Sequence, residues 1–165
     1  MKLARAVATF GGVGYLRPAP GTWGSLAALP CGWALHVVGG FPLLALGTCA
    51  AILGGWLATE RMTAGRADHD PSEIVIDEVA GQWIALVALS WHAWRMEIDI
   101  LRLWPGWIAA FLLFRLFDIW KPGPVVWADR RGDAWGVILD DAIAGAMAGL
   151  GVVALAGIWH GAMGW

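Results

Sequence analysis

Charged residues are scarce in this chain. They make up 15% of its 165 residues, whereas soluble domains carry about 25%. Ser and Glu are few, no Gly-X-Y period is present, and the only cysteines are Cys31 and Cys49, both in apolar runs. These absences exclude a disordered chain, a collagen and a disulfide scaffold, and they predict reduced, structural cysteines. Hydrophobic residues are instead abundant, at 59%, together with 13 Trp residues, so the composition indicates a membrane protein.

The longest apolar run covers residues 25–58 and contains no charged residue. It exceeds the length of one crossing, because about 20 helical residues span the hydrocarbon core of a bilayer. Gly39-Gly40-Phe41-Pro42 lies inside the run and is a turn signal. We therefore predict a hairpin of two short helices, at 26–38 and 42–58, whose outer ends lie on the same side of the membrane.

Three more apolar stretches have the length of membrane helices and are flanked by Trp, at 79–94, 103–120 and 143–159. The first ten residues place Leu3, Val7 and Phe10 on one helical face, which predicts either a short helix on the lipid surface or a frayed terminus. The predicted fold class is all-α: a polytopic helical membrane protein with about five membrane segments, the first two forming the hairpin, and an interfacial N-terminal helix. We expect a single domain over residues 1–165.

The basic residues predict the orientation of the chain. On the hairpin topology, all but two of the 11 Lys and Arg residues lie at or near one side of the membrane, the exceptions being Arg95 and Arg102. Short cytoplasmic loops collect Lys and Arg, so this side is expected to be cytoplasmic. A single crossing over 25–58 would divide the basic loops between the two sides. Most acids gather on the same side, and only Glu97 and Asp99 lie opposite.

Carboxylates recur where three predicted helices reach this cytoplasmic side. Asp77 and Glu78 open one helix, Asp118 lies near the end of the next, and Asp140 and Asp141 open the last. Ionisable groups at the edge of a membrane span are costly and point to function. Carboxylates without neighbouring His or Cys suit Mg²⁺. Helix capping by Asp77 and Asp140 is the alternative, but it accounts for one acid per helix only.

Small residues follow these acids at helical spacing. Gly81 comes one turn after Asp77, and Gly145 and Gly149 continue the face of Asp141. Small side chains at such positions predict a close approach of the helices, which would bring the carboxylates together. Other acids alternate with basic residues and are expected to be solvated loop residues; these are Glu60, Asp129 and Asp133.

Two elements are suited to hold a phosphate beside such a metal ion. Thr22 and Ser25 belong to Pro20-Gly21-Thr22-Trp23-Gly24-Ser25, where a loop enters the first apolar helix and the glycines permit a close approach. A simple helix cap is the alternative for this segment. Arg115 and Lys121 add a bidentate fork and a point charge. For Arg115 the alternative is a structural ion pair with Asp118, one turn further on.

Four ordered motifs closely resemble the phosphatidylglycerophosphatase A family. They are Pro-Gly-Thr-Trp-Gly-Ser at 20–25, Ile-Val-Ile-Asp-Glu-Val-Ala-Gly-Gln-Trp-Ile at 74–84, Phe-Arg-Leu-Phe-Asp-Ile-Trp-Lys-Pro-Gly-Pro at 114–124 and Gly-Val-Ile-Leu-Asp-Asp-Ala-Ile-Ala-Gly at 136–145. The similarity runs through residues 10–150. The chain departs from the family before the last motif, where a usually Gly-rich segment reads Gly-Asp-Ala-Trp-Gly at 132–136.

The resemblance implies a Mg²⁺-dependent lipid phosphatase of the bacterial inner membrane that removes the terminal phosphate of phosphatidylglycerol phosphate at the cytoplasmic face. Its chemistry would be in-line attack of water on phosphorus, assisted by Mg²⁺. The predicted metal ligands are Asp77, Glu78, Asp118, Asp140 and Asp141, and all of these except Asp140 are also predicted catalytic residues. The predicted phosphate-binding residues are Thr22, Ser25, Arg115 and Lys121.

The expected partners are the lipid substrate and the membrane, with no nucleic acid, and the sequence makes no prediction of oligomeric state. A cation-coupled small transporter is the alternative function, because acids in membrane helices also mark ion pathways. It is less favoured, since the acids lie at one interface and no internal repeat is present. Asp68-His69-Asp70 resembles the Asp-x-Asp of haloacid dehalogenases, but no apolar strand precedes it.

Overall fold

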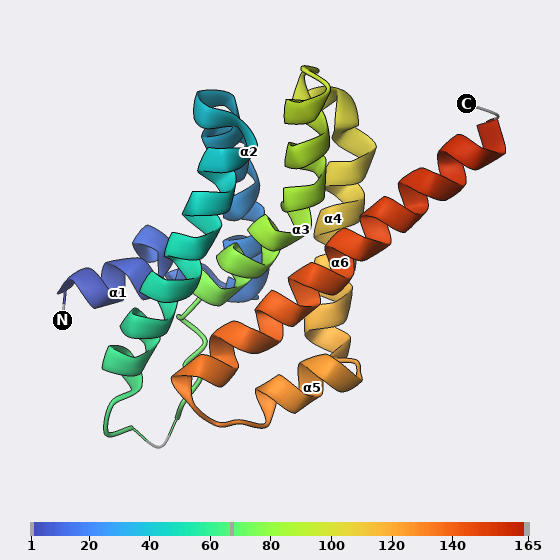
Figure 1. Cartoon of the computed structure of the whole chain (residues 1–165). Coiled ribbons are helices and arrows are strands. Elements are labelled where there is room, and N and C mark those ends of the chain that lie inside the picture. Colours follow the sequence, from blue (N-terminus) through green and yellow to red (C-terminus); the bar gives the residue numbers. More distant parts are fainter. Residues whose placement is uncertain (1, 67, 164–165) are drawn as a thin grey trace.

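The computed structural model describes residues 2–66 and 68–163, and every element within these ranges is a helix (Figure 1). The elements are α1 (Lys2–Ala8), the 3₁₀ helix η1 (Phe10–Tyr15), α2 (Pro20–Thr63), α3 (Ile76–Arg95), the 3₁₀ helix η2 (Ile100–Leu103), α4 (Trp104–Trp120), α5 (Gly123–Asp129) and α6 (Ala134–Met163). The all-α prediction is confirmed. α3 packs against α2, α4 and α6 and forms the centre of the molecule.

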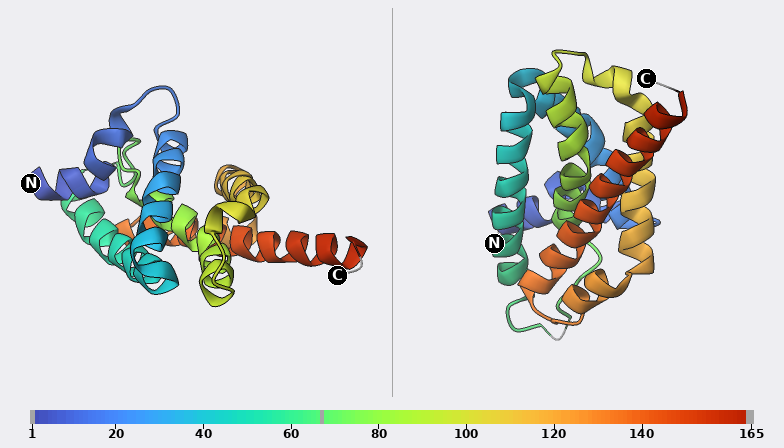
Figure 2. Two further views of the ribbon diagram at one scale, coloured as in Figure 1. Left: turned by 90° about the horizontal axis from the view of Figure 1, so that it is seen from above. Right: turned by 45° about the vertical axis from the view of Figure 1, so that its right-hand side comes forward.

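The predicted hairpin is present within α2. Its helical backbone is interrupted at Gly39 and at Gly40, where φ is 64°, a left-handed value that glycine adopts without steric cost. The two arms then run back along each other in opposite directions (Figures 1 and 2). Leu35 packs against Gly47 across the arms, where a Cβ on the glycine would stand 2.8 Å from Leu35 Cδ1.

The number of membrane segments is only partly matched. Three helical stretches are long and apolar enough to cross a membrane: Pro20–Thr63, which contains both hairpin arms, Ile100–Trp120 and Ala134–Ala162. α3 has 20 residues but is not among them. More than half of its residues are buried, so other helices shield it and less apolar character is needed. The predicted number of about five segments therefore agrees with the number of helical arms. It is larger than the number of stretches that are both long and apolar enough to cross a membrane.

The start of α6 differs from its prediction. The helix begins at Ala134, well before the apolar stretch 143–159, because Asp133 Oδ1 accepts a hydrogen bond from the Gly136 N–H at 2.7 Å. Asp140 and Asp141 therefore lie inside α6, and the prediction that they open the last helix is wrong. The far end of α6 extends away from the other helices (Figures 1 and 2).

A tight crossing joins α3 and α6. A Cβ on Gly81 would stand 2.6 Å from the Asp141 carbonyl oxygen, and one on Gly145 would stand 2.9 Å from the Gly81 carbonyl carbon. Neither position has room for a side chain. The predicted close approach at these glycines is confirmed, and it holds Asp77 and Asp141 at the same depth.

α1 is helical, as one of the two alternatives for the N-terminus predicted, and runs crosswise to the arms of α2 (Figure 1). Its Ala4 and Ala8 are buried, whereas Leu3 is 79% exposed. The Val75 N–H donates to the Ala8 carbonyl at 2.9 Å, which ties the segment before α3 to the end of α1. This bond fixes the backbone immediately before Asp77.

Candidate active site

Three carboxylates meet where α3 and α6 cross. Asp77, Glu78 and Asp141 each offer an oxygen, and these oxygens lie within 4.8 Å of one another. Asp77 and Asp141 are 6% and 3% exposed, and Glu78 is half-buried. Asp77 Oδ1 and Glu78 Oε2 are buried without a hydrogen-bond partner among the described residues. Crowded buried carboxylates repel one another, so the arrangement favours a bound cation.

The donor set indicates which cation fits. All three groups offer hard carboxylate oxygens, and no His or Cys belongs to the cluster. Hard oxygen donors suit Mg²⁺, whereas Zn²⁺ sites use His and Cys more often. The two unpartnered oxygens are the observation that fits such an ion, because each lacks the hydrogen bond that a buried carboxylate oxygen normally makes.

A cationic side chain from α4 stands beside the carboxylates. Arg115 Nη1 lies 2.5 Å from Asp118 Oδ2 and donates a long hydrogen bond, 3.5 Å, to Ser25 Oγ. Ser25 Oγ donates to the Gly21 carbonyl at 2.9 Å. The Arg115–Asp118 pair that the sequence offered as an alternative is therefore present, yet Arg115 also reaches the first turn of α2.

Gly21 lets α2 lie against Glu78 and Arg115. A Cβ at this position would stand 3.0 Å from Glu78 Cδ and 3.3 Å from Arg115 Nη1. The start of α2 can lie this close to the site because glycine has no side chain. Ser25, Glu78, Arg115 and Asp118 are thus brought together as predicted. Thr22 is half-buried on the same first turn, and its hydroxyl makes no hydrogen bond with the described residues.

Lys121 is the second cationic side chain near the carboxylates, and it binds Asp140. It ends α4 in a left-handed conformation, with φ of 48°, and its ammonium pairs with Asp129 and, at 2.8 Å, with Asp140 Oδ2. Burial lowers the pKa of Lys121, but the hydrogen bonds with the two carboxylates outweigh burial and raise the pKa overall. Lys121 is therefore charged at neutral pH. Asp140 therefore forms an ion pair with Lys121 and is not one of the three clustered carboxylates.

Several acids have partners that the sequence did not predict. Asp129 was expected to be solvated but pairs with Lys121, and Asp133 pairs with Arg131 and caps α6. The capping alternative for Asp77 is wrong, because Val75 is the cap residue of α3 and no side chain caps that helix.

Asp70 is a further acid at the site that sequence reasoning set aside with its neighbours 68 and 69. It lies on the loop between α2 and α3 and is exposed at its surface. The surrounding protein nevertheless partly buries its carboxyl, and this raises the pKa of Asp70. The positive charge of Lys121 lowers that pKa, and the negative charges of Asp68, Asp129 and Asp118 raise it, with a raised pKa as the net result. The Asp70 carboxyl is therefore close enough to Lys121 for their charges to interact. Its signal in the sequence was its place just before the motif at 74–84.

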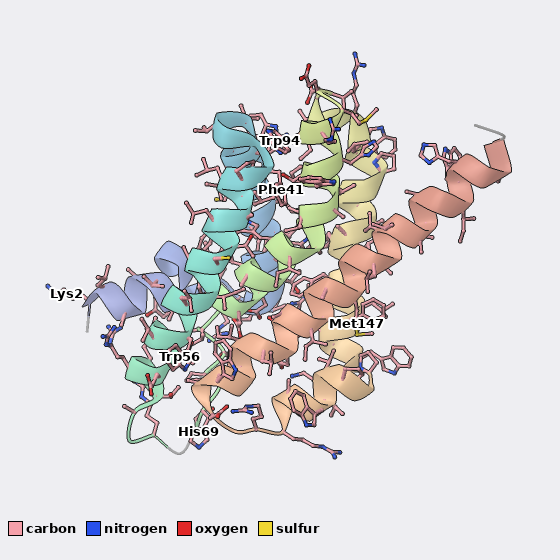
Figure 3. All side chains as sticks on the ribbon, viewed as in Figure 1. Lys2, Phe41, Trp56, His69, Trp94 and Met147 are labelled. Carbon is pink, nitrogen blue, oxygen red and sulfur yellow. The ribbon has the colours of Figure 1, made fainter. Side chains whose placement is uncertain are left out.

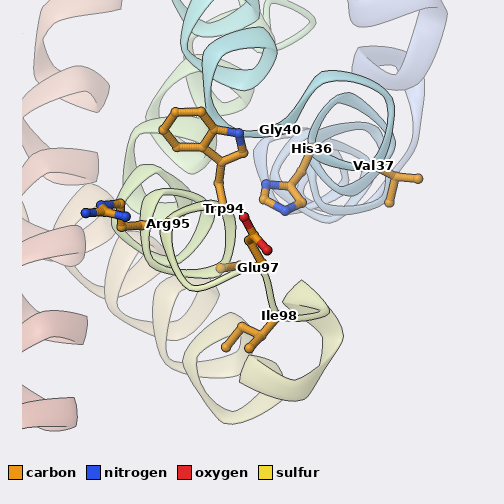
Figure 4. A pocket seen from close by; sticks show the side chains of 8 residues that line it. His36, Val37, Gly40, Trp94, Arg95, Glu97 and Ile98 are labelled. Carbon is orange, nitrogen blue, oxygen red and sulfur yellow. The ribbon is translucent and has the colours of Figure 1, made fainter.

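Two cavities lie away from this site. A cavity of about 510 Å³ at the tip of the hairpin is lined in part by His36, Trp94 and Glu97 (Figure 4). His36 Nδ1 lies 2.7 Å from Ser90 Oγ there. Trp56 and His69 border another cavity, beside the end of α2 and the start of α6 (Figure 3). Neither cavity contains a predicted site residue.

The helices and the site define a class of protein. Apolar helices long enough to cross a membrane carry, at one end of the bundle, a cluster of carboxylates with an arginine beside it. This is the arrangement expected of an integral membrane enzyme that acts on a phosphate group.

The chain belongs to the phosphatidylglycerophosphatase A family. The family model described as Phosphatidylglycerophosphatase A matches residues 6–156. Proteins named Phosphatidylglycerophosphatase A are similar to it: one from Haemophilus influenzae is 36% identical over 146 residues, covering 87% of this chain and 83% of the relative. One from Escherichia coli is 37% identical over 128 residues, covering 76% and 67%. The resemblance read from the four motifs is confirmed, and it favours a phosphatase over the transporter alternative.

A third relative has a different name. The "Putative phosphatidylinositol-3-phosphatase" of Bacteroides thetaiotaomicron is 35% identical over 140 residues, covering 81% of each chain. No solved structure matches this chain. The relatives thus agree on a lipid phosphatase and differ in the lipid that their names give.

Proposed function

We propose that this protein hydrolyses the terminal phosphomonoester of phosphatidylglycerol phosphate, yielding phosphatidylglycerol and phosphate, with the assistance of Mg²⁺. The observation that carries the proposal is the meeting of Asp77, Glu78 and Asp141 beside Arg115, in a chain of this family. Substrate phosphate is an oxygen-rich dianion. Carboxylates alone would repel it, so a cation between them and the phosphate is a requirement of the charge balance.

The carboxylates have the role of metal ligands. Asp77, Glu78 and Asp141 would hold Mg²⁺ directly, and Asp118 and Asp140 would contribute through water, since Mg²⁺ keeps several waters in most protein sites. When bound, Mg²⁺ would neutralise phosphate charge and lower the pKa of a water molecule. One of the carboxylates would accept a proton from the water that attacks phosphorus in line with the leaving glycerol oxygen, and that proton would pass to the leaving oxygen as the P–O bond breaks.

The remaining predicted residues hold the phosphate. Arg115 presents its guanidinium as a two-pronged donor, and Ser25 and Thr22 add hydroxyls from the first turn of α2. Lys121 contributes positive charge and orients Asp140, to which it is already bonded. Fixed cations around the equatorial oxygens stabilise the charge that develops during phosphoryl transfer.

The site faces the cytoplasm in this proposal, and the membrane is the inner membrane of a bacterium. Support comes from the basic residues, which gather at the end of the molecule where α2 and α3 begin and α4 ends. Catalysis at this depth lets the acyl chains of the substrate stay in the bilayer while the headgroup reaches the carboxylates.

The test is phosphate release from phosphatidylglycerol phosphate in detergent micelles by the purified protein, with and without Mg²⁺. We expect Mg²⁺-dependent release by the wild type and a loss of about 100-fold or more in Asp77→Asn and Asp141→Asn, because each removes a charged ligand. Glu97→Gln is the matched control, since Glu97 is an exposed acid at the other end of α3.

Two outcomes would contradict the proposal. A folded wild type that releases no phosphate with lipid and Mg²⁺ present would overturn it. Release from phosphatidylinositol 3-phosphate but not from phosphatidylglycerol phosphate would retain the phosphatase and reject the substrate.

A further inference from the structure

Buried polar side-chain atoms without a hydrogen-bond partner lie on α2, α3 and α4. Among the described residues they are Thr59 Oγ1, Asp77 Oδ1, Glu78 Oε2, Arg115 Nε and both polar atoms of the Gln82 amide, Nε2 and Oε1. Gln82 is 0% exposed. Native proteins rarely leave a buried amide unpaired, because that is destabilising, so an amide lacking both partners points to a function.

Gln82 lies on the face of α3 that carries Glu78. It follows Glu78 by one helical turn, so their side chains share a face of α3. Glu78 lies against the first turn of α2 and beside Arg115 of α4; further along the same face, Leu86 packs against a glycine of α2 and Leu89 against a glycine of α4. Gln82 therefore occupies the seam between the first arm of α2 and α4.

The unpartnered atoms of Glu78, Gln82 and Arg115 are chemically complementary. Gln82 Nε2 is a donor and Glu78 Oε2 an acceptor, while Arg115 Nε is a donor and Gln82 Oε1 an acceptor. We propose that Gln82 is a positioning residue, whose amide links the Glu78 carboxylate to the Arg115 guanidinium when the site binds Mg²⁺ and phosphate. The inference rests on the proposed function, in which Glu78 is a metal ligand and Arg115 binds phosphate.

Such a link has two consequences. It fixes the orientation of a metal ligand, and groups that do so typically change metal affinity by about 10-fold to 100-fold when they are removed. It also couples the two binding events, because phosphate on Arg115 then favours the Glu78 orientation that Mg²⁺ requires. Coupling of this kind is reciprocal: each ligand raises the affinity for the other by the same factor.

The experiment measures the midpoint of thermal unfolding of the full-length protein in detergent, against Mg²⁺ concentration, with and without inorganic phosphate. Gln82→Met keeps the length of the side chain and removes both polar atoms. We expect it to need at least about 10-fold more Mg²⁺ for the same shift, and to lose the effect of phosphate on Mg²⁺ affinity. Thr59→Val is the matched control. It also removes a fully buried polar atom without a partner, but on α2 rather than on α3.

The outcomes separate the hypotheses. A Gln82→Met protein with the Mg²⁺ affinity and phosphate coupling of the wild type would show that Gln82 only packs, and would overturn the proposal alone. A wild type without any Mg²⁺-dependent shift would overturn the proposed metal site as well. If Gln82→Met does not fold, Gln82→Glu replaces it, since that variant keeps an acceptor for Arg115 but loses the donor to Glu78; wild-type coupling in it would also overturn the proposal.

Discussion

At the scale of single residues, the missing side chain of Gly21 decides how closely α2 approaches the site. The first turn of α2 lies against the Glu78 carboxylate and the Arg115 guanidinium, with no room for a Cβ. Ser25, one turn later, is fully buried and bonded back to the Gly21 carbonyl. The glycine thus sets the distance between a proposed metal ligand and a proposed phosphate ligand.

Gly21→Ala should therefore impair activity more than stability. The added methyl displaces flexible side-chain ends, which costs little folding free energy, but misplacing a reacting group by about 1 Å can cost roughly 100-fold in rate. The measurement is kcat/KM for phosphate release together with the unfolding midpoint. Gly123→Ala is the control, because nothing lies within 4 Å of a Cβ there. Equal activity in the two variants would contradict the assigned role of Gly21.

The carboxylates, Ser25 and Arg115 could be predicted from the sequence because doubled acids and an arginine beside apolar helices have few structural explanations. Asp129 and Gln82 could not. Asp129 reaches Lys121 only because α5 turns the chain back, and no pattern predicts that short helix. The amide of Gln82 stands out only once its burial and lack of partners are known.

At the scale of elements, the position of α6 depends on two local features, its cap at Asp133 and its crossing with α3 at Gly145. The hairpin and the helical arms could be predicted because apolar length and a Gly-Gly-Phe-Pro turn are local signals. The start of α6 could not, since residues 134–142 are less apolar than the predicted span and become helical because Asp133 caps them. That early start places Asp140 and Asp141 inside the helix.

Gly145→Ala should weaken the crossing. Its methyl would meet backbone atoms of Gly81, which cannot move independently of α3. Overpacking of this kind typically costs about 1–3 kcal/mol, and activity should fall as Asp141 moves from Asp77. Thermal unfolding in detergent and phosphate release measure the two effects. Gly157→Ala on the same helix has open space around it and should cause neither loss; indistinguishable variants would argue against the crossing.

The cap of α6 should make stability depend on pH. The hydrogen bond from Arg131 lowers the pKa of Asp133, and the bond from the Gly136 N–H lowers it as well. A carboxyl with a lowered folded pKa contributes its stability above the unfolded pKa, about 3.9 for Asp, and loses it as pH falls through the folded value.

Asp133→Ala should cost about 1 kcal/mol at pH 7, and the difference from wild type should shrink below pH of about 4. Chemical unfolding at both pH values measures it. Asp133→Asn retains a capping oxygen and should lose less at pH 7. A cost for Asp133→Ala that does not change with pH would show that charge is not part of the cap.

At the scale of the whole molecule, the hairpin decides which loops share a side of the membrane. Because α2 turns back at Gly39–Gly40, the segment before α2 and the loop after it share one side of the membrane. α3 and α4 then run out and back, so the α5–α6 segment lies at the same end of the bundle as that loop, opposite the η2 segment (Figure 1). With this topology the first turn of α2 lies on the same side as the carboxylates of α3 and α6, where Gly21 contacts Glu78. The side of the membrane on which each segment lies can be tested without measuring catalysis.

Single cysteines should report this topology in a background with Cys31 and Cys49 replaced by Ala. Arg17 lies just before α2, Arg66 lies on the loop after α2, Arg130 lies between α5 and α6, and Arg102 lies in η2; all four are exposed. With the site facing the cytoplasm, a membrane-impermeant thiol reagent should label Arg102→Cys in spheroplasts, and should label Arg17→Cys, Arg66→Cys and Arg130→Cys only after the membrane is disrupted. The reverse pattern would place the site outside. Labelling that separates Arg17→Cys from Arg66→Cys would contradict the hairpin itself, because a single crossing by α2 would put the segments before and after it on different sides.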